Sequence, residues 1–222
     1  MCADSLRLGI LGGTFDPVHL GHLASAREVA AAFDLDTVLM LLSARPPHKT
    51  QTAQAPAAQR LEMLRLAVQG DPVLQACDME MRREGASYTV DTLRELSTAY
   101  PGAELFLILG ADAYAEIDTW SRPQELPQLC NIIVTSRPGR ASDTAPPLPP
   151  VAARNQSRYD PRVGCHLHES GHVIVGHRIH GIEASASDVR RRVALGLRIE
   201  DLTGPAVARY IHEQHLYGAR TN

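Results

Sequence analysis

Short apolar runs alternate along the chain with longer stretches in which apolar and polar residues follow a helical period. The runs predict strands at Leu6–Leu11, Thr37–Leu42, Val73–Met79, Leu105–Leu109 and Ile132–Thr135. The stretches between them predict helices at Gly21–Phe33, Ala57–Gln69, Thr89–Tyr100 and Ala111–Ile117. Strands that alternate with helices in this way favour a doubly wound parallel sheet, covered by helices on both faces.

The last part of the chain departs from this alternation. Residues 137–161 are rich in Pro, Ser, Ala and Arg, so we expect a surface loop there. Residues 185–222 are expected to form a small helical C-terminal part. It would hold one helix over Ser185–Leu195 and a last helix that starts near Gly204-Pro205. With no internal repeat, residues 1–222 are predicted to be a single Rossmann-like α/β domain.

Composition and charge narrow the class of protein. The 222 residues suffice for one domain with a substantial core, and a net charge of -3 gives no basic field suited to nucleic acid. No apolar run approaches the ~20 residues that cross a membrane, and the first five residues do not resemble a signal peptide. The four cysteines form no Cys-x-x-Cys. We therefore expect reduced thiols and a cytoplasmic protein without a nucleic-acid or membrane partner.

The loop after the first predicted strand is the most informative segment, and it reads Gly-Gly-Thr-Phe-Asp-Pro-Val-His-Leu-Gly-His over residues 12–22. Glycines let backbone N–H groups approach a phosphate, and the start of the following helix favours an anion. His19 and His22 would lie on one face at that helix start. There they could donate hydrogen bonds to phosphate oxygens without supplying a nucleophile. A tight glycine turn with two surface histidines is the alternative.

His-Leu-Gly-His at residues 19–22 resembles the HxGH signature of the nucleotidylyltransferase superfamily. The preceding Gly-Gly-Thr-Phe-Asp-Pro narrows the resemblance to enzymes that move an adenylyl group from ATP. The resemblance implies that His19 and His22 are catalytic. It also implies an ATP phosphate site made by Gly12, Gly13, Thr14 and Phe15.

Two basic residues follow later strands. In Pro46-Pro47-His48-Lys49, the prolines stiffen the loop, which lowers the entropy lost when Lys49 is held near a phosphate. This loop resembles one in nicotinate mononucleotide adenylyltransferases, which implies that Lys49 faces the phosphates. Arg137 follows the fifth strand and has a counterpart in the same family. A solvated loop and a surface arginine are the alternatives.

Ser87-Tyr88-Thr89 precedes a predicted helix, and we expect Ser87 or Thr89 to cap it. The positive end of a helix suits a carboxylate better than a carboxamide, which favours nicotinate over nicotinamide. An ordinary cap without a ligand is the alternative. The segment resembles the Ser-Tyr-Thr motif of the same family, and this implies that both residues bind the nicotinate nucleotide.

Gly110-Ala111-Asp112 follows the fourth strand, and Trp120 is the chain's only tryptophan. Glycine at a strand end permits close approach of a sugar or base, and Asp112 can accept hydrogen bonds from ribose hydroxyls. Trp120 could stack on a pyridine ring, although a core tryptophan is equally consistent with the sequence. The family pattern of Gly-x-Asp followed by Trp implies that Gly110, Asp112 and Trp120 bind the nicotinate nucleotide.

Ser185-Ala186-Ser187-Asp188-Val189-Arg190 resembles a C-terminal signature of the superfamily, Ile-Ser-Ser/Ala-Thr-x-Ile-Arg. Hydroxyls at a helix start offer donors to phosphates, and an arginine adds a planar fork that grips their oxygens. The resemblance implies that Ser185, Ser187 and Arg190 bind the ATP phosphates. Ala184 and Ser187 depart from the pattern, but both keep the helix start plausible.

The motifs together resemble the bacterial nicotinate-nucleotide adenylyltransferase family. The resemblance implies that ATP and nicotinate mononucleotide give deamido-NAD and pyrophosphate, with Mg²⁺ accompanying ATP. Another HxGH enzyme, such as the pantetheine-phosphate adenylyltransferase, and a non-catalytic nucleotide sensor are the alternatives. The oligomeric state stays open.

His168-Glu169-Ser170-Gly171-His172 also fits H-E-x-x-H, the zinc-protease pattern, which needs both histidines on one helix face. The flanking residues favour a hairpin instead, because Val163, Cys165 and Leu167 alternate with a strand's period. We therefore expect no protein-bound metal here and a hairpin with exposed histidines. An incidental zinc site that uses Cys165 or a nearby histidine stays open.

Overall fold

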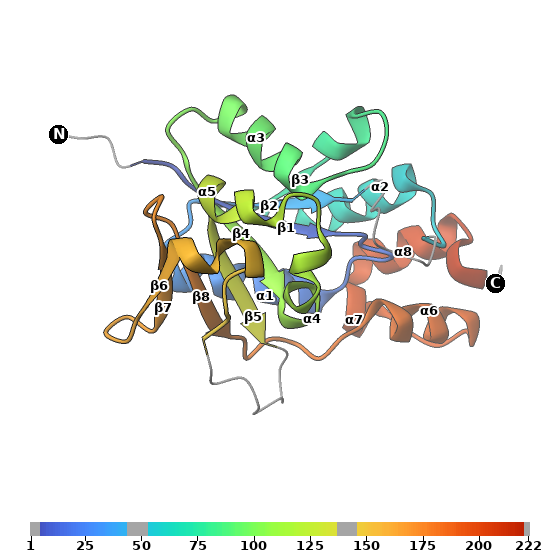
Figure 1. The fold of residues 1–222 in the computed structure, drawn as a ribbon. Coiled ribbons are helices and arrows are strands. Elements are labelled where there is room, and N and C mark those ends of the chain that lie inside the picture. Colours follow the sequence, from blue (N-terminus) through green and yellow to red (C-terminus); the bar gives the residue numbers. More distant parts are fainter. Residues whose placement is uncertain (1–4, 44–52, 137–145, 220–222) are drawn as a thin grey trace.

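The computed structural model describes residues 5–43, 53–136 and 146–219, which form one eight-stranded sheet with helices on both faces (Figure 1). The strand order is β3-β2-β1-β4-β5-β8-β7-β6. The strands are β1 (Arg7–Gly13), β2 (Thr37–Leu42), β3 (Leu74–Cys77), β4 (Glu104–Gly110), β5 (Asn131–Ser136), β6 (Ser157–Asp160), β7 (Cys165–His168) and β8 (Val173–Arg178). Strands β1 to β5 and β8 are parallel, whereas β7 and β6 continue the sheet in antiparallel pairs. The predicted α/β class is confirmed.

The two faces of the sheet belong to two separate apolar clusters. Along β2, Val38 and Met40 join one cluster, whereas Leu39 and Leu41 join the other. This alternation explains the unbroken apolar runs in the sequence, because both faces of each central strand are covered. The first cluster lies under α1 (Leu20–Ala32), α2 (Ala57–Val68), α6 (Ala186–Ala194), α7 (Glu200–Thr203) and α8 (Pro205–Glu213). The second lies under α3 (Thr89–Ala99), α4 (Ala111–Ala115) and α5 (Leu126–Leu129).

Short 3-10 helices join several of these elements. They are η1 (Met79–Arg82), η2 (Ile117–Thr119), η3 (Pro123–Glu125), η4 (Val151–Gln156) and η5 (Leu216–Gly218). The predicted helix over Ala111–Ile117 is therefore shorter, since α4 ends at Ala115 and Ile117 already belongs to η2. The predicted helical C-terminal part from residue 185 onward is confirmed by α6, α7 and α8.

The expectation of a loop over residues 137–161 is wrong for its second half. Residues 137–145 lie outside the described residues, but 151–156 form η4 and 157–160 form β6. Strand β6 has the polar sequence Ser-Arg-Tyr-Asp and pairs with β7 alone, at the edge of the sheet. Its order depends on that partner strand, so a local pattern of apolar residues could not reveal it.

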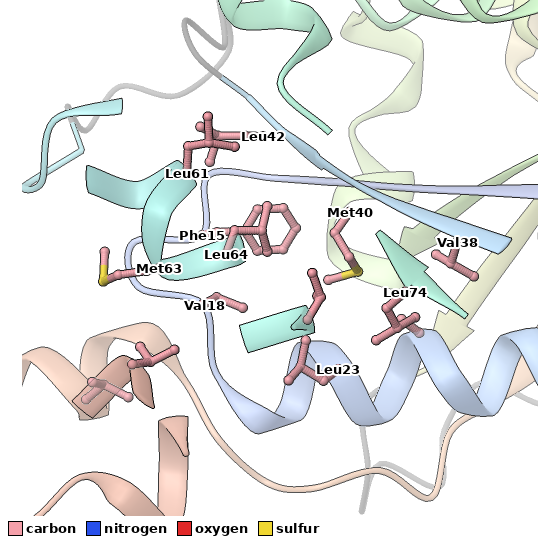
Figure 2. Packing of buried hydrophobic residues seen from close by; sticks show 14 of the residues in the cluster. Phe15, Val18, Leu23, Val38, Met40, Leu42, Leu61, Met63, Leu64 and Leu74 are labelled. Atoms are coloured by element: carbon pink, nitrogen blue, oxygen red, sulfur yellow. The ribbon is translucent and has the colours of Figure 1, made fainter. Parts of the chain in front are cut away.

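The predicted phosphate loop between β1 and α1 is anchored in the core. Phe15 and Val18 are buried in the same cluster as Leu61 and Leu64 of α2 (Figure 2). A Cβ atom at Gly13 would lie 2.9 Å from the Phe15 ring, so the loop needs glycine at this close approach. The loop thus has a fixed place between β1 and α1, at the switch point where the strand order continues with β2 on one side of β1 and with β4 on the other.

Candidate active site

A cavity of about 220 Å³ opens beyond the carboxyl ends of β1, β2 and β4. This is where open α/β sheets bind ligands, at the switch point of the strand order. Its walls are largely apolar, with Ile10, Leu107 and Leu109 from the sheet and Leu93 from α3. Six of the residues proposed from sequence line it: Gly12, Gly13, Thr14, Ser87, Thr89 and Trp120.

The start of α3 forms one wall of this cavity. Tyr88 occupies the N-cap position, and no side-chain cap is present, so the expectation that Ser87 or Thr89 caps the helix is wrong. Tyr88 takes the N-cap position because the backbone leaves its extended conformation there, and a Tyr side chain cannot reach back to the first turn. Asp91 N–H donates to the backbone oxygen of Tyr88, whereas no side chain caps the N–H groups of Thr89 and Val90, which a ligand in the cavity could use.

Trp120 lies where either interpretation of the sequence would place it. It packs against the second apolar cluster and also lines the cavity, directly after η2. Gly110 and Asp112 do not line the cavity: they lie at the N-terminus of α4, where Asp112 is exposed. Ala113 and Glu116, slightly further along the chain, do line it. Open space surrounds the position of a Gly110 Cβ atom, which leaves room for a ligand at this edge.

His19 and His22 lie together at the start of α1, as predicted. His19 is the N-cap residue, and its ring stacks on that of His22 with 3.6 Å between the ring centroids. The backbone N–H of His19 donates to His22 Nδ1 at 3.3 Å, which leaves the His22 proton on Nε2, the atom that could donate to a phosphate. Burial lowers the pKa of His19 to about 4, so its imidazole is neutral near pH 7. Its Nδ1 has no hydrogen-bond partner among the described residues.

The second predicted phosphate helix, α6, starts beside the same loop. Arg190 donates to the backbone oxygen of Asp16 at 2.6 Å, which joins α6 to the loop that carries the two histidines. The Ser185 hydroxyl caps α6 by accepting from the Asp188 N–H at 3.1 Å, and it lies 3.2 Å from the Ser187 hydroxyl. Ser185 thus holds the helix start in place, and Ser187 lies one residue inside it.

The connection from β8 to α6 lies against α1. Glu28 of α1 accepts hydrogen bonds from the backbone N–H groups of His180 and Gly181. A Cβ atom at Gly21 would lie 2.9 Å from the Ile182 backbone oxygen and 3.0 Å from His19 Nδ1. Glycine in the HxGH motif therefore lets this connection pass close over the start of α1, and this brings the two helix starts together.

Three buried polar residues near the site were missed by the sequence interpretation. Arg60 is 2% exposed and donates to the backbone oxygens of Thr14, Ser43 and Ala55. A signal was present, since Arg60 stands in the buried stripe of α2 four residues before Leu64. The second missed residue, Asp16, is 8% exposed and belongs to the phosphate loop itself.

Glu80 is the third missed residue, and it lines the cavity at 4% exposure. Its carboxylate accepts from the hydroxyls of Thr92 at 2.9 Å and Ser43 at 3.2 Å. The predicted strand Val73–Met79 ends one residue before Glu80, whereas the structure ends β3 at Cys77 and begins η1 at Met79. This early turn is what brings the Glu80 side chain to the cavity.

Lys49, with the preceding Pro46-Pro47-His48, and Arg137 lie outside the described residues. Their proposed contacts with phosphates therefore stay predictions. Phe15, also proposed for the phosphate site, is buried, and its ring meets His22 edge to face at 5.0 Å. Its side chain supports the loop and the histidine, which leaves its backbone as the part that could meet a phosphate.

The H-E-x-x-H segment forms the predicted hairpin. His168 ends β7, His172 precedes β8, and Gly171 makes the turn with φ 93°. The expected exposure of its histidines is wrong for His168, which is 4% exposed. Burial follows from long-range packing: β6 covers one side of β7, and the Ser170 hydroxyl docks the turn by donating to the Pro127 backbone oxygen.

We predict that this hairpin holds no stoichiometric zinc. The Nδ1 atoms of His168 and His172 both lie within 3.0 Å of the Ser170 hydroxyl oxygen, so each ring is already engaged in the turn. In the described part of the chain, no three His, Cys, Asp or Glu side chains are grouped closely enough to hold a metal ion. Elemental analysis of the purified protein tests this. One tightly bound zinc per chain, together with loss of activity in His172→Ala, would contradict it.

Comparison with known proteins gives the class and then the family. Residues 10–192 match the family Cytidylyltransferase-like. A protein of Citrifermentans bemidjiense named "Probable nicotinate-nucleotide adenylyltransferase" is 42% identical over 214 residues, which span 96% of this chain and 98% of that protein. A protein of the same name from Geobacter sulfurreducens is 40% identical over 213 residues, again 96% of this chain and 98% of the relative.

Solved structures share the fold. The Plasmodium falciparum nicotinic acid mononucleotide adenylyltransferase complexed with NaAD superposes with a TM-score of 0.69 at 17% identity, over 96% of this chain and 98% of that one. The fold and the paired helix starts thus define a nucleotidyltransferase of the Cytidylyltransferase-like class. Within that class, the chain belongs to the nicotinate-nucleotide adenylyltransferase family. The resemblance inferred from its motifs is confirmed.

Proposed function

We propose that this protein transfers the adenylyl group of ATP to nicotinate mononucleotide, which yields deamido-NAD and pyrophosphate in NAD biosynthesis. One observation carries the proposal: Arg190 joins the α6 start to the loop of His19 and His22, beside an apolar cavity that has an uncapped helix start and Trp120 in its walls. This arrangement offers one site for phosphates and an adjoining one for a flat, anionic ring. Pyrophosphate release with both substrates tests the proposal.

The reaction requires that the two substrates be held in position and that positively charged side chains stabilise their phosphates; it requires no nucleophile from the protein. The phosphate of the mononucleotide is already anionic and would attack the α-phosphorus of ATP, while the bond to pyrophosphate breaks. His22 would donate from Nε2 to an oxygen of the transferring phosphate, and neutral His19 would support it by stacking. Arg190 and Lys49 would neutralise charge on the departing pyrophosphate, and the Ser187 hydroxyl would donate a hydrogen bond to one of its oxygens.

Mg²⁺ is proposed as the ion that enters with ATP. It would be bound mainly by phosphate oxygens and water, as Mg²⁺ commonly is in nucleotide sites. Asp16, the carboxylate nearest the histidines in sequence, is not proposed as a ligand, because it already accepts three hydrogen bonds within the protein.

No helix in the described ranges is long and apolar enough to span a membrane. The cytoplasm is proposed as the compartment.

We predict a preference of at least about tenfold in kcat/KM for nicotinate over nicotinamide mononucleotide. The uncapped start of α3 offers N–H donors and a positive dipole end to a ring carboxylate in the cavity. A carboxamide would turn its NH₂ group toward one of these donors, and an unpaired buried polar group costs roughly 1–3 kcal/mol. Turnover measured with each mononucleotide checks this. Equal efficiency would refute the carboxylate site but not adenylyl transfer.

The alternatives can be separated by the same assay. A pantetheine-phosphate adenylyltransferase would release pyrophosphate with phosphopantetheine and not with nicotinate mononucleotide. A nucleotide sensor would bind ATP without releasing pyrophosphate. The chain belongs to the nicotinate-nucleotide adenylyltransferase family, and this membership argues against both alternatives.

A further inference from the structure

The C-terminal end of the described chain reaches back to the phosphate loop. Tyr217 in η5 donates its hydroxyl hydrogen to Asp16 Oδ1 at 2.7 Å. Asp16 lies three residues before His19, in the segment that joins β1 to α1. Two residues 201 positions apart in the sequence therefore share a hydrogen bond in the loop that carries the proposed catalytic histidines.

Asp16 is a junction rather than a surface carboxylate. It is 8% exposed, and it also accepts from the backbone N–H groups of Gln54 at 2.7 Å and Ala55 at 3.1 Å. Each of these bonds is stronger for having a charged acceptor. Burial and the bond to Asp16 raise the pKa of the Tyr217 hydroxyl, which therefore stays protonated as the donor.

Two arginines hold the same loop by its backbone. Arg60 donates to the oxygen of Thr14 at 2.5 Å, and Arg190 donates to the oxygen of Asp16 at 2.6 Å. The loop is thus fixed from α2, from α6 and from the C-terminal end. Of these three contacting residues, the sequence motifs singled out only Arg190 and gave no sign of Arg60 or Tyr217.

The backbone on both sides of the contact adopts the left-handed region at residues that carry side chains. Phe15, next to Asp16, has φ 46°, and Tyr217 has φ 56° with His215 two residues earlier at φ 51°. Such conformations cost free energy outside glycine and persist where tertiary contacts determine them. The backbone adopts this unfavourable conformation at η5, where the Tyr217 hydroxyl donates to Asp16.

We propose that Tyr217 is a positioning residue for adenylyl transfer: its hydrogen bond fixes Asp16 and thereby the loop that presents His19 and His22 to the phosphates. The proposal rests on the proposed function of this site. Tyr217, like Asp16, does not line the cavity assigned to the nicotinate side. Its effect is therefore confined to the placement of the phosphate centre.

Tyr217→Phe removes the hydroxyl and keeps the ring. We expect kcat to fall about tenfold, because small misplacements of reacting groups are costly, while KM for nicotinate mononucleotide changes by less than about twofold. Tyr159→Phe is the matched control, since Tyr159 is exposed on the edge strand β6. An unchanged kcat in Tyr217→Phe, or an equal loss in the control, would overturn the proposal.

A double variant distinguishes positioning through Asp16 from a general structural effect. If Tyr217 acts through Asp16, Tyr217→Phe lowers kcat little further in an Asp16→Ala background, where the acceptor of its hydrogen bond is absent. Multiplying losses would contradict the proposal.

Amide hydrogen exchange of residues 12–23 gives a readout that does not depend on turnover. Exchange should be faster in Tyr217→Phe than in Tyr159→Phe, and equal exchange would overturn the proposal. Because wild-type turnover is measured separately, failure of the proposed function and failure of this inference remain distinguishable.

Discussion

His22→Ala is expected to lower adenylyl transfer roughly a hundredfold or more while the protein stays folded. Loss of one positioned donor to developing charge costs on the order of 3 kcal/mol in the barrier. The side chain stacks on His19 and meets Phe15 by its edge, so its removal leaves the core clusters in place. Steady-state kinetics with both substrates, together with circular dichroism, measure the two effects.

His212→Ala is the matched control for this variant, because His212 is exposed in the last turn of α8. It should keep wild-type activity. Near-native transfer by His22→Ala would show that the catalytic assignment is wrong.

Arg60→Met is expected to reduce the free energy of unfolding by about 3 kcal/mol, the usual cost when a buried charged donor is removed from its partners. Methionine keeps much of the side-chain length but leaves the backbone oxygens of Thr14, Ser43 and Ala55 without this donor. It also leaves buried Asp16 without the nearby positive charge of Arg60. Urea denaturation measures the change.

Arg65→Met on the same helix provides the control. The Arg65 side chain is 55% exposed and forms surface ion pairs with Glu62 and Asp78, so about 0.5 kcal/mol or less is expected. Equal destabilisation by the two variants would contradict the role of Arg60 as the support of the phosphate loop.

The central fold could be predicted from sequence because its strands are covered on both faces. Continuous apolar runs such as Thr37–Leu42 follow from that burial, and they reappear as β1 to β5 with small shifts of their ends. Strand β6 was missed, since its four residues are polar or exposed and only the pairing with β7 orders them. The hairpin of β7 and β8 was predicted. The parallel pairing of β8 with β5 was not, because it depends on contacts between residues far apart in sequence.

The site shows the same division between local and long-range signals. The motif residues around His19, Ser87 and Arg190 could be found because glycines, hydroxyls and helix starts recur in a known order. The cap of α3 was predicted wrongly, because a shift of one residue decides whether Ser87 or Tyr88 occupies the N-cap position.

The junction of Asp16, Arg60 and Tyr217 was not foreseen. Its members come from the phosphate loop, α2 and the end of the chain. Arg60 donates to the loop at the backbone oxygen of Thr14, and a backbone acceptor of this kind cannot be recognised from the sequence.

The most direct test of the central claim is pyrophosphate release by the purified protein with ATP, Mg²⁺ and nicotinate mononucleotide, with the dinucleotide product identified by mass spectrometry. We predict one pyrophosphate for each deamido-NAD formed, and none above background when either nucleotide is omitted. Pyrophosphate release that does not depend on nicotinate mononucleotide, or no release with both substrates present, would contradict the account.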